Sequence, residues 1–132
     1  MLQLGRSRAD TWSVRPRALV CEDNPALCSV VGDLVEAHGW SATRASTATD
    51  ALELASALHP DLVVLDISLV GMSGLESIPR LRADCPETRV VAMAASERGH
   101  DLCLDAGACA VVTTADLDRL DQVLADLQSD AA

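Results

Sequence analysis

The sequence predicts an α/β fold in which helices cover both faces of a five-stranded parallel sheet. Short runs rich in Leu and Val alternate with segments of helical spacing from about residue 17 to the end of the chain. The run at 62–66 has no polar alternation before its last residue, which is typical of a strand buried on both faces. Short connections between the five strand–helix units favour parallel strands with helices on both sides.

Residues 17–22 are expected to form the first strand, and the helix that follows has a clear start and end. Asn24 is a good N-cap, and Pro25 suits the first helical position. Gly39 ends the helix. Helical spacing places five apolar residues on one face of it: Leu27, Val30, Val31, Leu34 and Val35.

Residues 40–45 form a shorter and more polar strand, which we expect at an edge of the sheet. Thr47 or Thr49 caps the next helix, and His59-Pro60 ends it. The residues expected to face inward from this helix are Ala51, Leu54, Ala55 and Leu58.

Residues 62–66 form the central strand, and a loop over 67–73 leads to a third helix. Pro79 lies inside that helix and should kink it or delay its start, because proline lacks the amide proton that a helix uses. Cys85-Pro86 ends the helix. The residues expected to face inward are Leu75, Ile78 and Leu81.

The last two units follow the same pattern. Residues 89–94 form the fourth strand, and Ser96 can cap a short fourth helix that ends at Ala106-Gly107. Residues 109–113 form the fifth strand, and the last helix begins near Asp116. The apolar face of this last helix consists of Leu117, Leu120, Val123, Leu124 and Leu127.

The length fits one domain, which we place at 17–128 between an N-terminal arm at 1–16 and a C-terminal tail at 129–132. The net charge of −10 argues against nucleic acid as a partner. Residues 1–17 hold four Arg and one Asp, so we expect a basic, flexible arm. No apolar run could span a membrane and no signal peptide is evident, so we expect a cytoplasmic protein without a membrane partner.

The five cysteines form no metal-binding pattern. Cys21 and Cys109 lie in predicted strands, Cys28 lies in a predicted helix, and no Cys-x-x-Cys pair occurs. We therefore expect buried free thiols rather than a zinc site.

Carboxylates stand at the ends of two predicted strands. Glu22 and Asp23 follow the first strand, and Asp66 ends the central one. If these strands are neighbours, the three carboxylates meet at the carboxyl edge of the sheet, where functional groups of such folds collect. Carboxylates that close repel one another. The commonest reason for such an arrangement is a divalent cation together with chemistry on one of the carboxylates.

The stretch Pro60 to Leu75, PDLVVLDISLVGMSGL, resembles the centre of the receiver domain of response regulators. The acidic pair after the first strand and Ala106-Gly107-Ala108 before the last strand also match, so the resemblance covers roughly 17–128. It implies a flavodoxin-like, three-layer α/β/α sandwich with the strand order 2-1-3-4-5.

The resemblance also implies a role for each acidic residue. Asp66 would accept a phosphoryl group from a histidine kinase, a phosphotransfer protein or a small phosphodonor. Glu22, Asp23, Asp66 and the backbone carbonyl of Ser68 would hold Mg²⁺, which prefers such oxygen ligands and neutralises charge on the transferring group.

The sequence departs from the family at the positions that normally contact the phosphoryl oxygens. Ala94 stands where the family has Ser or Thr, and Thr114 stands where it has Lys. Thr114 can donate one hydrogen bond but carries no charge. Val111 replaces the usual aromatic residue, and Val70 replaces a proline. We therefore expect that Asp66 can be phosphorylated but that the family's usual switch does not operate.

The leading interpretation is an atypical single-domain receiver that acts through contact with an unidentified output protein, and the sequence leaves homodimer formation open. The alternative is a pseudo-receiver that binds its partner without phosphorylation, and Mg²⁺ affinity would separate the two. An enzyme with an Asp nucleophile is disfavoured because Ser68 stands where such enzymes carry a second acid. A nucleotide-binding fold is disfavoured because no Gly-rich loop follows the first strand.

Overall fold

A computed structural model describes residues 15–68 and 74–131, so the arm up to residue 14 and Val70 lie outside the described residues. Five strands form one sheet in the order β2-β1-β3-β4-β5, and every neighbouring pair is parallel. This confirms the predicted fold class and strand order. The strands are β1 (Arg17–Cys21), β2 (Ser41–Ala45), β3 (Leu62–Asp66), β4 (Arg89–Ala94) and β5 (Ala110–Thr113).

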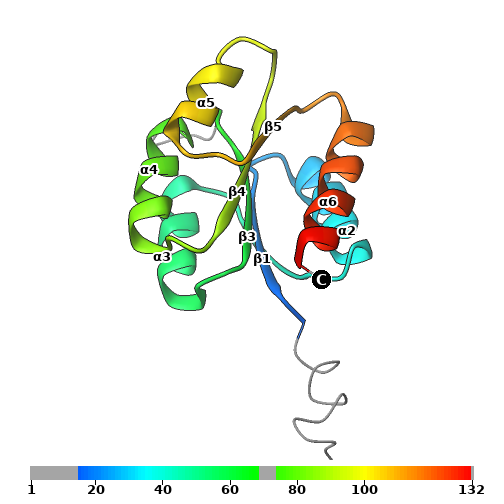
Figure 1. The fold of residues 1–132 in the computed structure, drawn as a ribbon, viewed down its shortest axis with the longest axis horizontal. Helices are drawn as coiled ribbons and strands as arrows, with labels where there is room; N and C mark the ends of the chain where they lie inside the picture. The colour runs from blue at the N-terminus through cyan, green and yellow to red at the C-terminus, as the bar shows by residue number, and fades with distance from the viewer. Residues whose placement is uncertain (1–14, 69–73, 132) are drawn as a thin grey trace, which may run out of the picture.

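The helices cover both faces of this sheet, as predicted, and form the outer layers of a sandwich (Figure 1). Helices α3, α4 and α5 pack on one face, and α2 and α6 pack on the other (Figure 1). Their bounds are α2 (Pro25–Ala37), α3 (Ala48–Leu58), α4 (Gly74–Asp84), α5 (His100–Ala106) and α6 (Leu117–Ala131).

Strand β3 is central and every residue of it is buried. Leu62 and Val64 pack under α2 and α6, whereas Val63 and Leu65 pack under α3, α4 and α5. This explains the continuous apolar run, because neither face of the strand meets water. Asp66 is the last residue of β3, so a carboxylate stands where the strand ends.

Several local predictions are confirmed by the helix ends. The Asn24 side chain accepts a hydrogen bond from the Leu27 amide, and Pro25 occupies the first position of α2. Thr47, rather than Thr49, is the N-cap of α3, because its hydroxyl accepts from the Asp50 amide. These contacts supply partners for amides that the first helical turn leaves unpaired.

Two local predictions were wrong. Val30 was expected to face inward but is 44% exposed, and Cys28 takes its place on the buried face of α2. One residue along a helix is a rotation of roughly 100°, which carries Val30 away from the buried Val31. Ser96 does not cap α5, which begins four residues later at His100, and its hydroxyl accepts from the Arg98 amide instead.

The bounds of α4 agree with the prediction, whereas two other boundaries differ. Helix α4 begins at Gly74, directly after the loop predicted over 67–73, and continues through the exposed Pro79 to Asp84, so the proline does not delay its start. Cys109 was expected to be a buried thiol in the fifth strand, but it is exposed and precedes β5, while the other four thiols are buried. Helix α6 extends to Ala131, into the segment expected to be a tail.

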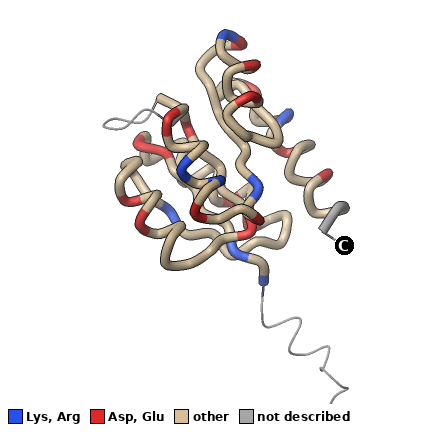
Figure 2. Tube along the Cα trace, turned by 60° about the vertical axis from the view of Figure 1, so that its left-hand side comes forward, with Lys and Arg blue, Asp and Glu red and all other residues tan. Residues whose placement is uncertain are grey.

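Acidic side chains outnumber basic ones among the described residues. Figure 2 shows the acidic positions along the trace, and basic positions where the chain enters the sheet. No helix within the described ranges is long and apolar enough to cross a membrane.

Candidate functional site

The ends of β1 and β3 are held side by side, which brings together the residues that follow them. Cys21 of β1 pairs in register with Leu65 of β3, so Glu22 and Asp66 occupy the next position of each chain. The Glu22 amide donates to the Ala45 carbonyl of β2 at 3.0 Å, which fixes the exit of β1. The acidic residues therefore meet at the carboxyl edge of the sheet, as the sequence predicts.

Glu22, Asp23 and Asp66 form one compact acidic cluster, in which one carboxylate oxygen from each lies within 4.8 Å of the other two. Glu22 is only 3% exposed and Asp66 5%, whereas Asp23 faces solvent. The cluster therefore combines two buried carboxylates with one that water can reach.

The pKa of Glu22 is raised to about 8, first by burial and then by the hydrogen-bonding contact with Asp66 and by its charge. The Asn24 amide donates to Glu22 Oε2 at 3.0 Å and opposes this shift. The other oxygen, Oε1, is buried and accepts no hydrogen bond from a described residue. A buried acceptor without a donor, beside two further carboxylates, fits a divalent cation with oxygen ligands such as Mg²⁺.

Ser68 makes a contact with Asp66 that the sequence prediction missed. Its backbone amide donates to Asp66 Oδ1 at 2.8 Å, and its hydroxyl donates to the same oxygen at 2.6 Å. The prediction assigned a role only to the Ser68 carbonyl. The available signal was a serine two residues after an aspartate that ends a strand, since Asp side chains often accept a bond from the amide two residues on.

Ala94 and Thr114 lie at the same edge of the sheet as Glu22. Ala94 ends β4, two strands from β1, and Thr114 follows β5, three strands from β1. Ala94 is 2% exposed and has no polar side-chain atom to offer. The Thr114 amide donates to the Ala94 carbonyl at 2.8 Å, so the two replaced positions are neighbours. The chain contains no lysine, so neither position supplies the ammonium group that the resemblance leads one to expect.

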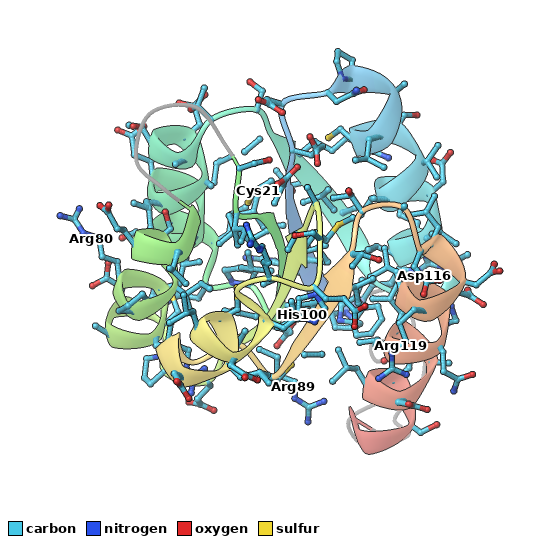
Figure 3. All side chains as sticks on the ribbon, turned by 90° about the horizontal axis from the view of Figure 1, so that it is seen from above. Cys21, Arg80, Arg89, His100, Asp116 and Arg119 are labelled. Carbon is cyan, nitrogen blue, oxygen red and sulfur yellow. The ribbon has the colours of Figure 1, made fainter. Side chains whose placement is uncertain are left out.

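A hollow of about 380 Å³ lies between α5, β5 and the start of α6. His100 lines this hollow, its Nε2 is buried, and no described residue hydrogen-bonds to that atom. Figure 3 looks at the molecule from above and shows His100 between α5 and α6, with Asp116 and Arg119 on the α6 side. A larger hollow of about 710 Å³, lined by Trp40 among others, lies where the strands begin, at the other end of the sheet from the carboxylates.

Residues 18–125 match the family model of the response regulator receiver domain. The polar-differentiation response regulator DivK of Brucella ovis is 39% identical over 66 residues, which is 50% of this chain and 54% of DivK. The protein named Probable transcriptional regulatory protein TcrX, of Mycobacterium tuberculosis, is 35% identical over 94 residues, 71% of this chain and 39% of TcrX. The matches therefore span about half of DivK and two fifths of TcrX.

Solved structures show the same fold. A CheY-like receiver domain protein of Methanospirillum hungatei superposes with a TM-score of 0.74 at 23% identity, over 90% of this chain and 100% of that one. A Burkholderia pseudomallei response regulator with a phosphorylated aspartic acid, a calcium ion and citrate superposes with a TM-score of 0.69, also at 23% identity, over 89% of this chain and 73% of that one.

Proposed function

The chain belongs to the response regulator receiver domain family, and from this premise we propose that Asp66 accepts a phosphoryl group with the help of Mg²⁺. The acidic cluster is the observation that carries this proposal. It contains a buried carboxylate at the end of the central strand and two further carboxylates within 4.8 Å. The Burkholderia pseudomallei structure supports it, because that relative in fold carries a phosphorylated aspartic acid together with a divalent cation.

In the proposed reaction, an oxygen of Asp66 attacks the phosphorus of a phosphohistidine or of a small phosphodonor. The new O–P bond forms as the donor's bond to phosphorus breaks, and the donor keeps the electron pair of that bond. Glu22, Asp23 and the Ser68 carbonyl would hold Mg²⁺ beside Asp66. Bound there, Mg²⁺ would neutralise charge on the transferring oxygens. The raised pKa of Glu22 means that this residue gives up a proton when the cation binds.

We propose that phosphorylation is communicated to another protein by direct contact at the surface formed by α5, β5 and α6. Receiver domains interact with histidine kinases or phosphotransfer proteins, and this surface is the one that the family commonly uses for output. On this chain it carries two exposed leucines, Leu102 at 58% and Leu104 at 47%. The two leucines lie on either side of the buried Cys103, so α5 offers apolar side chains for contact on both of its exposed flanks.

The test is incubation with a small phosphodonor and MgCl₂, followed by intact-mass measurement. We expect a mass gain of one phosphoryl group in the wild-type chain, and none with EDTA or in Asp66→Asn. A matched control is Asp105→Asn, which changes an exposed acid on α5 and should gain the phosphoryl group normally. A wild-type chain that gains no mass with Mg²⁺ present would count against the proposal.

A second candidate function is a pseudo-receiver that binds its partner without phosphorylation. It is favoured by the replaced positions, since Ala94 offers no hydrogen bond and no lysine is present. Calorimetric titration with MgCl₂ separates the two candidates. Binding at millimolar Mg²⁺ that is weakened by Glu22→Gln supports the phosphoacceptor, whereas no binding supports the pseudo-receiver.

A further inference from the structure

We propose that the Ser68 hydroxyl is a movable hydrogen-bond donor of the acidic cluster. In the structure it donates to Asp66 Oδ1 at 2.6 Å. When a divalent cation takes that oxygen, the hydroxyl is released and donates to the phosphoryl group. The inference rests on the proposed function, but its first half concerns cation binding alone and is tested separately.

The two oxygens of Asp66 are not equivalent in this structure. Oδ1 accepts from both the Ser68 amide, at 2.8 Å, and the Ser68 hydroxyl, at 2.6 Å. Neither Ser68 donor reaches Oδ2, and the further hydrogen-bonding contact of the Asp66 carboxyl is the one with Glu22. A carboxylate oxygen has two lone pairs, so both lone pairs of Oδ1 are engaged.

In the proposed site one oxygen of Asp66 would be the nucleophile and the other would bind the cation. Both Ser68 donors point to Oδ1 and so orient that oxygen toward the Ser68 backbone. We therefore assign the attack to Oδ2 and the cation to Oδ1, from which one of the two donors would have to leave. The amide is fixed by the turn after β3, whereas the hydroxyl leaves by a rotation about the Ser68 Cα–Cβ bond between staggered positions. The hydroxyl is therefore the group that competes with the cation.

The released hydroxyl would add a hydrogen-bond donor to a site that has few. Ala94 has none, and the chain has no lysine, so the phosphoryl oxygens lack two donors that the family normally supplies. A hydroxyl that starts 2.6 Å from one carboxylate oxygen lies within hydrogen-bond reach of a phosphoryl group attached to the other. Ser68 keeps its proton throughout, and it acts as a positioning residue, first for Asp66 before the cation binds and then for the phosphoryl group during the transfer.

The test compares Ser68→Ala and Ser68→Thr with the wild-type chain in two measurements. Calorimetry with MgCl₂ gives the affinity for the cation, and intact mass at saturating Mg²⁺ gives the rate of phosphorylation. Loss of the competing hydrogen bond should tighten Mg²⁺ binding by about twofold to tenfold in Ser68→Ala. The same variant should be phosphorylated about tenfold more slowly, because a donor to a charged group is missing. Ser68→Thr keeps the hydroxyl and should restore both values.

The opposite directions of these two effects distinguish this role from a structural one. A merely structural role would weaken Mg²⁺ binding and slow phosphorylation together, and that result would overturn the inference. Unchanged Mg²⁺ affinity in Ser68→Ala would overturn it as well. Ser56→Ala, which changes an exposed serine on α3, should alter neither value. If no variant and no wild-type chain is phosphorylated, the proposed function fails, and the Mg²⁺ affinities alone decide whether the hydroxyl competes.

Discussion

Glu22→Gln is expected to remove most of the pH dependence that the acidic cluster gives to the stability of the metal-free protein. The pKa of Glu22 rises from 4.5 to about 8 on folding, with burial as the first cause. Between these values the unfolded chain has released the proton while the folded chain keeps it. The stability that the protonated Glu22 contributes is therefore fully present below pH 4.5 and is lost as the pH rises through about 8.

The size of the effect follows from the pKa difference of about 3.5 units, because each unit corresponds to about 1.36 kcal/mol. The upper limit for the loss of unfolding free energy is thus about 5 kcal/mol. Because Asp23 is exposed, solvent screening reduces this loss, and we expect about 2–4 kcal/mol between pH 4.5 and 8. Gln carries no charge at either pH, so the variant should lose this slope and be more stable than the wild type at pH 8.

The assay is urea denaturation in EDTA at several pH values from 5 to 8. Unfolding is monitored by the fluorescence of the buried Trp40 and by circular dichroism. Glu36→Gln is the matched control, since this glutamate is exposed on α2 and should leave the pH dependence unchanged. If the wild type and Glu22→Gln lose stability in parallel between pH 5 and 8, the reasoning about the acidic cluster is refuted.

Three further predictions concern the cation, the core and the replaced lysine. Mg²⁺ should raise the melting temperature more at pH 8 than at pH 5, because Glu22 must release its proton to bind the cation, and an equal rise at both would contradict this. Leu120→Ala should lower the unfolding free energy by about 3 kcal/mol in urea, because Leu120 is 0% exposed, and a loss below about 1 kcal/mol would contradict its place in the core. Thr114→Lys should speed phosphorylation of Asp66 by about tenfold in the intact-mass assay, because it adds a cation for the phosphoryl oxygens, and an unchanged rate would contradict this.

The meeting of the carboxylates could be predicted because it depends on strand topology. Parallel strands in register place their ends at one edge, and the pairing of Cys21 with Leu65 aligns Glu22 with Asp66. The start of α2 was also predictable, because Asn24 and Pro25 act through bonds to their own first turn. Both features rest on backbone geometry, which sequence patterns encode directly.

The contacts that could not be predicted depend on single side-chain torsions and on small rotations. The bond from the Ser68 hydroxyl to Asp66 depends on one rotamer of a residue outside any helix or strand. Val30 and Cys28 lie on opposite margins of the apolar face of α2, so spacing alone did not decide which is buried. Ser96 has the chemistry of a helix cap, but the backbone makes a turn there and α5 begins only at His100.

Reductive trapping of the phosphorylated chain tests the central claim most directly. After reaction with a small phosphodonor and MgCl₂, borohydride reduces an acyl phosphate to an alcohol, which converts a phosphorylated aspartate to homoserine. Peptide mass spectrometry then locates the change. We predict homoserine at position 66 alone, at the end of β3 and next to Glu22. A known receiver domain, treated in parallel, is the positive control. If that control forms homoserine and this chain forms none, or forms it at another position, the assignment of Asp66 as the phosphoacceptor is contradicted.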